Sequence, residues 1–245
     1  MRERRSPPTL RLYRWSAPTL SIGYGQDLGR DVDREACRAR GIAIVRRVSG
    51  GRAVLHDAEL TYSVSAPAGL AGFGDGLDAA YRGIAAGLVA ALRLLGVEGA
   101  STARGRSGGG RRHPGCFAAV ARHEIDVGGR KLVGSAQRRL DGGFLQHGSI
   151  LIEAHGALLA QVLRGGRDAD PGERMVGLAE LLSPCPAPAA IAAAVAAGCA
   201  AAWGCALEAG EPGAGELEEA RALEASRYRS EEWNVGRLPP APEPR

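Results

Sequence analysis

The sequence predicts an α+β fold, and three observations support this prediction. Strand-like patterns fill most of the first two thirds of the 245-residue chain, and from Gly156 to about Arg229 the pattern is helical. Residues 116–153, within the strand-rich part, read as three strands joined by two glycine turns, which is typical of an antiparallel meander. Strands followed by helices favour an α+β domain over an α/β domain, in which the two alternate.

Composition is that of an ordinary globular protein, with 45% apolar and 24% charged residues. We expect a single domain over residues 1–237 and a disordered tail over residues 238–245. The net charge is only +4 and aromatic residues make up 4%, so we expect no nucleic-acid partner. The alanine-rich segment 187–207 favours a packed helix over a membrane span, and we expect no membrane partner.

The cysteines are five in number and irregularly spaced. An odd number without a regular spacing argues against a disulfide framework. The first residues have no apolar run of the kind that a secretory signal requires. We therefore expect reduced thiols and a cytoplasmic protein.

In the first part of the chain, glycine and proline separate short strands. Asp31 is a plausible N-cap of a helix that ends before Gly41, and Pro67 closes the last strand. The strand patterns lie on both sides of Ser16-Ala17-Pro18 within residues 10–25, and over residues 42–47, 53–56 and 59–65.

The second part begins with the clearest helix, residues 77–95, whose apolar residues recur every three or four positions until Gly96. Residues 101–115 have the composition of a loop. The meander then follows, with strands over residues 123–127, 130–138 and 144–153.

The segment RRVSGGRAVLHD, residues 46–57, is the first candidate site. Its glycines would let backbone N–H groups approach a ligand, and its arginines would supply a positive fork for a phosphate or carboxylate. A plain tight turn with solvated arginines remains the alternative. The candidate substrate-binding residues are Arg47, Ser49, Gly50, Gly51, Arg52 and His56.

Two strands of the meander supply further candidates. In GRKLVGSAQRR, alternation places Lys131, Ser135 and Gln137 on one face, and a glycine within a strand suggests a close approach. In FLQHGSILIE, His147 is either a structural histidine or part of a site. The candidate substrate-binding residues here are Gly134, Ser135, Ala136, Gln137, His147 and Gly148. HExxH, paired CxxC and GxSxG patterns are missing, so we predict neither a metal site nor a serine triad.

Cys116 and Lys131 are the candidate catalytic residues. They are 15 positions apart, and Lys131 is the only lysine in the chain. If the first hairpin of the meander folds as predicted, the two side chains can meet at one end of the sheet. An ammonium beside a thiol favours a thiolate, which is the nucleophile of covalent acyl transfer. The alternative is that Cys116 is a small buried hydrophobic residue.

Three motifs in order, RRVSGGRAVLHDAELTYSV, GRKLVGSAQRR and LQHGSILIE, resemble the lipoate–protein ligase A and octanoyltransferase branch of the biotin/lipoate protein ligase superfamily. SIGYGQ and RYRSEEWN also fit, so the resemblance covers roughly residues 12–237. It implies a mixed, largely antiparallel sheet flanked by helices, as in a biotin/lipoate ligase catalytic domain.

The resemblance is greatest to the cysteine-dependent octanoyltransferases, through Cys116-Phe117 and the step to Lys131. It implies transfer of octanoate from acyl carrier protein, through an acyl-cysteine, to a lysine of a lipoyl-domain protein. Glycine cleavage H protein and the 2-oxoacid dehydrogenase E2 subunits are examples of such an acceptor. The resemblance also implies that residues 49–52 and 134–137 line the acyl channel and that no cofactor is required.

Three alternatives stay open at this point. An ATP-dependent lipoate–protein ligase would need ATP and Mg²⁺ and no cysteine. A lipoyl or octanoyl amidotransferase would use the cysteine with another donor. A carrier-protein binder would keep the fold without turnover.

Overall fold

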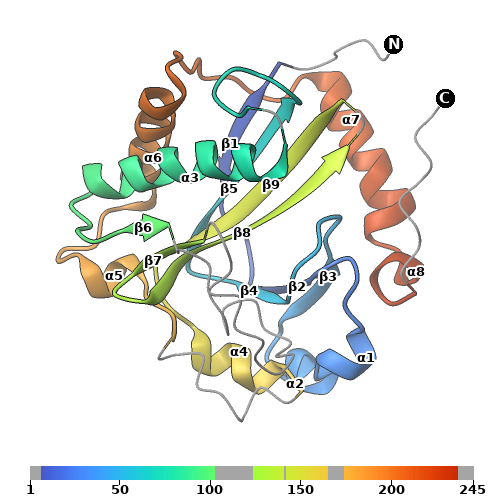
Figure 1. Ribbon diagram of the computed structural model, residues 1–245. Coiled ribbons are helices and arrows are strands. Elements are labelled where there is room, and N and C mark those ends of the chain that lie inside the picture. The colour runs from blue at the N-terminus through green and yellow to red at the C-terminus, as the bar shows by residue number, and fades with distance from the viewer. Residues whose placement is uncertain (1–6, 75, 103–123, 141, 165–173, 237–245) are drawn as a thin grey trace.

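The computed structural model describes residues 7–74, 76–102, 124–140, 142–164 and 174–236 (Figure 1). Its central element is a six-stranded sheet in the order β1-β5-β9-β8-β7-β6, in which all neighbouring strands are antiparallel. The strands are β1 (Thr9–Tyr13), β5 (Glu59–Pro67), β6 (Ser101–Thr102), β7 (Ile125–Val127), β8 (Arg130–Leu140) and β9 (Gly143–Leu151). The predicted meander is therefore confirmed as β7-β8-β9, and Gly128 and Gly129 form its first turn with φ of 59° and 79°.

A second sheet of three strands, β3-β2-β4, lies beside one end of the first. It contains β2 (Thr19–Ile22), β3 (Ala43–Arg46) and β4 (Val54–His56). Strand β2 pairs parallel with β3 and antiparallel with β4, which makes the strand pairing of the whole fold mixed, as predicted. Strand patterning alone did not reveal that these three strands separate from the large sheet.

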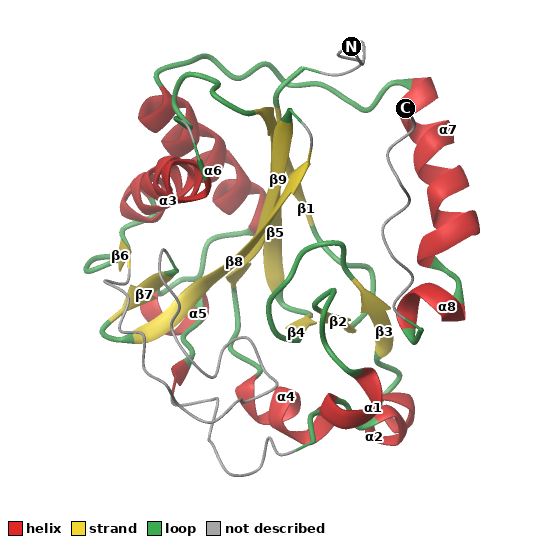
Figure 2. Cartoon of the chain, turned by 45° about the vertical axis from the view of Figure 1, so that its right-hand side comes forward, coloured by secondary structure: helices red, strands yellow, loops and turns green. Residues whose placement is uncertain are grey.

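One face of the large sheet is covered by α3 (Leu77–Leu94) and α6 (Pro188–Trp203) (Figure 2). Their glycines permit close contact: a Cβ on Gly198 would lie 2.4 Å from the Ala91 backbone nitrogen, and one on Gly87 would lie 2.9 Å from the Cys199 sulfur. The alanine-rich segment is thus a packed helix, as expected. None of the helices in the described residues is long and apolar enough to cross a membrane.

The remaining helices are short. Three of them, α1 (Leu28–Asp31), α2 (Arg34–Ala39) and α4 (Gly156–Val162), contribute residues to a second apolar cluster under the small sheet. The others in the described residues are α5 (Leu178–Leu181), α7 (Ala214–Leu223), the π-helical turn Glu224–Tyr228 and α8 (Glu231–Asn234).

Some predicted boundaries were wrong. The N-cap of the helix before Gly41 is Asp33, whose carboxylate accepts from the Ala36 N–H at 2.9 Å, whereas Asp31 ends the separate helix α1. Ser101 and Thr102 form β6 rather than a loop, because Ser101 and Asp126 are register partners. Gly204, with φ of 64°, ends α6 and opens an exposed connection that the sequence pattern did not indicate. The predicted tail lies outside the described residues.

Arg46 ties the C-terminal helix α8 to the small sheet. Its side chain is only 2% exposed. The guanidinium donates to the carbonyls of Trp233 and Asn234 in α8 at 3.1 and 3.0 Å. In return, the Trp233 indole N–H donates to the Arg46 carbonyl at 2.8 Å.

The same guanidinium also holds the loop that follows β2. It donates to the carbonyls of Gly23, Tyr24 and Gln26 at 3.1, 2.9 and 2.8 Å. Since buried carbonyls are costly to leave without a donor, Arg46 stabilises two segments far apart in the sequence.

We expect Arg46→Met to lower the free energy of unfolding by about 3 kcal/mol or more, because several buried carbonyls would lose their donor. Arg40→Met is the matched control, since Arg40 is exposed and its loss should cost no more than about 0.5 kcal/mol. Urea unfolding of both variants measures the effect. A difference between them of less than about 1 kcal/mol would contradict this role of Arg46.

Candidate active site

The glycine turn at residues 48–52 is shaped by Arg47. The guanidinium donates to the carbonyls of Gly50 and Arg52 at 2.9 and 2.7 Å. It also donates to the carbonyl and the hydroxyl of Ser21 in β2, at 3.1 and 3.2 Å. Arg47 therefore fixes the turn against the small sheet, in addition to any contact with an anion.

The loop after β2 packs against the glycine turn. The Tyr24 N–H donates to the Ser49 carbonyl at 2.9 Å. A Cβ on Gly23 would lie 2.0 Å from the Gly51 oxygen, so only glycine allows this approach. Gly51 itself has a φ of 95°, a conformation that favours glycine. Close backbone contact at Gly23 and the positive φ at Gly51 thus explain why these two positions are glycine.

The turn meets the large sheet through Ser49 and His147. The Ser49 hydroxyl lies 2.6 Å from Nε2 of His147 in β9, and Ser49 is 1% exposed. Burial, together with the charges of Arg47 and His56, lowers the pKa of His147 from 6.5 to about 4. The imidazole is therefore neutral at pH 7. Arg138 of β8 adds a second link, since it donates to the Val48 carbonyl at 3.0 Å.

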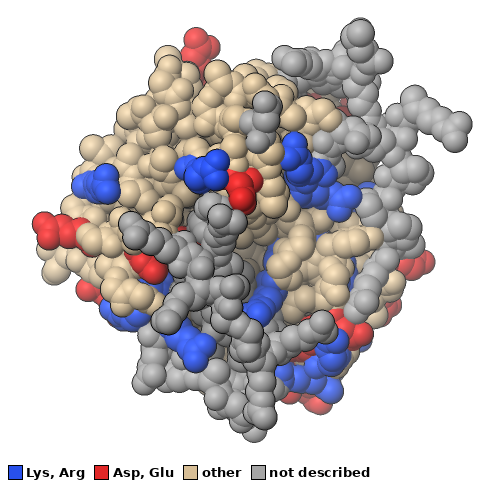
Figure 3. Space-filling view, viewed as in Figure 1, with Lys and Arg blue, Asp and Glu red and all other residues tan. Residues whose placement is uncertain are grey.

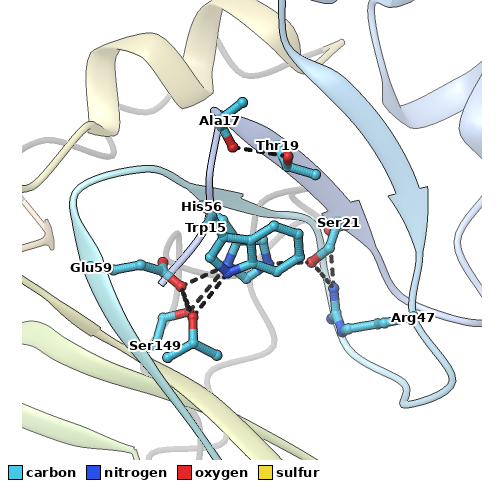
Figure 4. Close-up of polar contacts among 9 residues, drawn as sticks. Trp15, Ala17, Thr19, Ser21, Arg47, His56, Glu59 and Ser149 are labelled. Atoms are coloured by element: carbon cyan, nitrogen blue, oxygen red, sulfur yellow. Dashed lines mark hydrogen bonds and ion pairs between the residues drawn. The ribbon is translucent and has the colours of Figure 1, made fainter. Parts of the chain in front are cut away.

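His56 lies in a buried polar cluster that is linked to Arg47 through Ser21 (Figure 4). Its Nε2 is 2.7 Å from the Ser21 hydroxyl and its Nδ1 is 2.8 Å from Oε1 of Glu59. The ring stacks on Trp15, with 4.2 Å between centroids and 14° between planes. Both ring nitrogens thus contact protein side chains, which favours a supporting role for His56 over direct contact with substrate.

The face of the large sheet that carries Tyr62 holds a second polar group. The Tyr62 phenol is 2.6 Å from the Ser135 hydroxyl, and burial raises the pKa of Tyr62 to about 12. Gln146 donates to the phenol at 3.3 Å and accepts from Gln137 at 3.0 Å. A Cβ on Gly148 would lie 2.7 Å from the Tyr62 ring, so glycine is required for the phenol to reach Ser135.

From Val133 onwards, alternation along β8 places Ser135 and Gln137 on one face and Gly134 and Ala136 on the other, where Ala136 pairs with His147. Between Val133, the partner of Ile125, and Lys131, the partner of Asp126, the register of β8 shifts, so the predicted face shared by Lys131 with Ser135 and Gln137 was wrong. Lys131 is 0% exposed, and its ammonium is hydrogen-bonded to the buried carboxylate of Glu124.

Cys116 lies outside the described residues, so its meeting with Lys131 stays a prediction. Two of the described cysteines are poor nucleophiles, because burial raises the pKa of Cys37 to about 11 and that of Cys199 to about 12. A thiol that stays protonated at neutral pH does not act as the attacking thiolate.

Comparison with known proteins decides the family. The family model of the lipoyl protein ligase A/B catalytic domain matches residues 1–199. The octanoyltransferase LipM of Kyrpidia tusciae is 44% identical over 93% of this chain and 87% of its own length. That of Symbiobacterium thermophilum is 40% identical over 94% of this chain and 87% of its own. This chain belongs to the lipoyl protein ligase A/B family.

The fold comparison agrees with the sequence comparison. A solved structure of lipoate-protein ligase A bound with ATP superposes with a TM-score of 0.82 at 25% identity, covering 96% of this chain and 88% of the other. The predicted superfamily and fold class of this lipoyl protein ligase A/B family member are therefore confirmed.

The sequence pattern missed several buried polar residues near the site. Glu59 and Thr61 lie in β5, where polar and apolar residues alternate, Ser149 lies in β9, and Glu124 precedes β7. A buried polar side chain needs a partner, but alternation of polar and apolar residues is also the pattern of a half-exposed strand, so the sequence held no signal that would have singled out Glu59 and Thr61. Among the residues that the structure describes, no cluster of three or more histidine, cysteine or acidic side chains could hold a metal ion.

Because the pKa of His147 in the folded protein lies below its ordinary value, the unfolded chain binds a proton first as the pH falls. Stability from the neutral imidazole is fully present above pH 6.5 and is lost as the pH falls towards 4. We expect this loss to reach about 3 kcal/mol. The measurement is the free energy of unfolding of the wild type and His147→Gln over this range. The variant should show the shallower dependence on pH, and identical slopes would contradict the burial of a neutral His147.

Proposed function

We propose that this enzyme takes an octanoyl group from acyl carrier protein, holds it as a thioester on Cys116, and delivers it to a lysine of a lipoyl-domain protein. The observation that carries the proposal is the 44% identity to an octanoyltransferase over 93% of the chain. The activity of this family member is octanoyl transfer in lipoate biosynthesis. The donor, the acceptor and the residue roles given below extend that statement.

In the first step, the thiolate of Cys116 attacks the thioester carbonyl carbon. The new bond joins this carbon to the Cys116 sulfur, and the bond to the phosphopantetheine sulfur breaks, so that a thiolate leaves and takes up a proton from solvent. In the second step, the neutral amine of the acceptor lysine attacks the acyl-cysteine. The amide forms, the amine releases one proton to solvent, and the bond to the Cys116 sulfur breaks, which restores the Cys116 thiolate.

Lys131 is the proposed partner of Cys116 in both steps. Its ammonium would favour the thiolate and would stabilise negative charge on the carbonyl oxygen as the tetrahedral intermediate forms. The Glu124 carboxylate, which is 4% exposed, accepts a hydrogen bond from this ammonium. A buried ammonium is costly without such a partner, so Glu124 would keep Lys131 charged and in place.

The glycine turn at residues 48–52 is the proposed wall of the acyl site. Gly50 and Gly51 are exposed, while Ser49 is buried against the neutral His147. Exposed backbone held by buried side chains is a preorganised surface for an uncharged thioester. The strand segment 134–137 would form the other wall, as the resemblance implies.

The carrier and acceptor proteins are proposed from the family and from charge. A solved neighbour is described with its E2 lipoyl domain, which supports a lipoyl-domain acceptor. Figure 3, which shows the molecule from the same side as Figure 1, has basic side chains interspersed with acidic ones. Separate basic groups suit a protein docking surface with acidic partners and do not form the continuous basic stripe of a nucleic-acid binder.

A cytoplasmic location completes the proposal. The cysteines among the described residues, Cys37, Cys185, Cys199 and Cys205, are all free thiols. Free thiols are the state that a reducing compartment maintains.

The test is mass spectrometry of the full chain mixed with octanoyl-acyl carrier protein. We expect a mass increase of roughly 126 Da on Cys116, the octanoyl group in place of the thiol hydrogen, and no increase in Cys116→Ala. Lys131→Ala should form the adduct about a hundredfold more slowly. Full transfer to a lipoyl domain by Cys116→Ala would contradict the mechanism.

A second prediction concerns the wall of the acyl site. An alanine Cβ at Gly50 would meet nothing within 4 Å and its φ is not positive, so Gly50→Ala should change the free energy of unfolding by no more than about 0.5 kcal/mol. If acyl substrate lies against the turn, the added methyl should slow adduct formation about tenfold or more. Gly215→Ala in α7, which also has open space, is the control. A wild-type rate for Gly50→Ala would exclude this wall.

A further inference from the structure

The buried polar cluster in Figure 4 connects its groups in series. Glu59 Oε1 contacts His56 Nδ1 at 2.8 Å, and His56 Nε2 contacts the Ser21 hydroxyl at 2.7 Å. The Ser21 oxygen then accepts from the Arg47 guanidinium at 3.2 Å. Arg47 holds the glycine turn through two backbone carbonyls. A continuous path of hydrogen bonds therefore runs from Glu59 to the turn.

For a neutral His56, the two ends of this path set the order of donors and acceptors. The Glu59 carboxylate can only accept, so Nδ1 donates to it; Nε2 is then an acceptor, and the Ser21 hydroxyl, whose oxygen accepts from Arg47, donates to Nε2. The other ring nitrogen, Nδ1, then carries the histidine proton and donates it to the Glu59 carboxylate. The opposite tautomer would place the Nδ1 lone pair against that carboxylate at 2.8 Å, which is repulsive.

The surroundings of Glu59 and His56 hold both groups in place. Oε1 of Glu59 also accepts from the hydroxyls of Thr61 and Ser149, at 2.5 and 2.9 Å. The Trp15 indole, stacked on the His56 ring, donates to Thr61 at 2.9 Å. Glu59 is 1% exposed and His56 is 6% exposed, so water competes little for these hydrogen bonds.

We propose that Glu59, His56 and Ser21 form a positioning relay that sets the orientation of Arg47 and, through Arg47, the shape of the glycine turn at which octanoyl transfer occurs. The expected effect on the rate of acyl transfer rests on the proposed function. The predicted order of the hydrogen bonds does not depend on that function. None of the three residues touches substrate. Each acts through the next, and a shift of the turn by a fraction of an ångström is enough to slow acyl transfer.

Two serines provide a matched pair for the test. Ser21 and Ser149 are 2% and 3% exposed, and each places one hydroxyl in the cluster. Ser21 lies on the path between His56 and Arg47. Ser149 donates to Glu59 and lies 3.4 Å from His56 Nδ1, on the side of the cluster away from Arg47.

The kinetic experiment compares Ser21→Ala with Ser149→Ala in the full chain, using the rate of octanoyl adduct formation from octanoyl-acyl carrier protein. Ser21→Ala should slow this rate about tenfold or more, and Ser149→Ala should stay within about threefold of the wild type. Thermal unfolding of both variants shows whether their stabilities match. Equal losses of rate in the two variants would overturn the relay.

The spectroscopic experiment is histidine-selective ¹⁵N NMR of the full chain, which has five histidines. Loss of one signal set in His56→Gln assigns His56. The relay predicts a protonated Nδ1 and an unprotonated Nε2 at neutral pH in the wild type and in Ser149→Ala. Glu59→Gln, which keeps an acceptor oxygen, should keep this tautomer and most of the rate, whereas Glu59→Leu should lose both. A protonated Nε2 in the wild type would overturn the relay.

The two experiments also separate this inference from the proposed function. If the wild type forms no octanoyl adduct, the proposed function is wrong, and the NMR spectrum, which needs no acyl substrate, still decides the order of the hydrogen bonds.

Discussion

The arrangement of this protein depends on two adjacent arginines at the end of β3. Arg46 is buried and donates to carbonyls of α8 and of the loop after β2. Arg47 donates to Ser21 and to the carbonyls of the glycine turn. A guanidinium suits this task because its planar set of five donors reaches several carbonyls at once and never loses its charge. The C-terminal helix, the small sheet and the turn are therefore fixed relative to one another by one dipeptide.

This constraint explains how a site can be both exposed and rigid. The backbone of Gly50 and Gly51 faces solvent, while Ser49 beside it is buried and the Arg47 that holds it is half-buried. His147 is neutral because burial lowers its pKa to about 4. A neutral, preorganised polar surface suits a thioester, which develops charge only as it reacts. The proposed source of charge stabilisation is Lys131 in β8, which is hydrogen-bonded to Glu124 and is not part of the glycine turn.

Much of the fold follows from the sequence. Glycine turns, alternation and helical spacing located the meander and α3, and the resemblance gave the superfamily. The second sheet was missed because strand patterns do not say with which strand each one pairs, and the N-cap was misplaced because Asp31 and Asp33 have the same side chain. Long-range contacts were also invisible: nothing local in the sequence links Arg46 to Trp233, or Glu59 to the turn. The roles assigned to Cys116 and Lys131 came from residue chemistry and resemblance, and remain proposals.

The source of acyl activation distinguishes a thioester-dependent transferase from an ATP-dependent ligase. The most direct measurement is octanoylation of a lipoyl-domain lysine by the purified full chain under two conditions. One supplies octanoyl-acyl carrier protein without nucleotide, and the other supplies free octanoate with ATP and Mg²⁺. Octanoyl transfer through Cys116 requires product in the first condition and none in the second. Product formed only from free octanoate with ATP would contradict it and would establish a ligase.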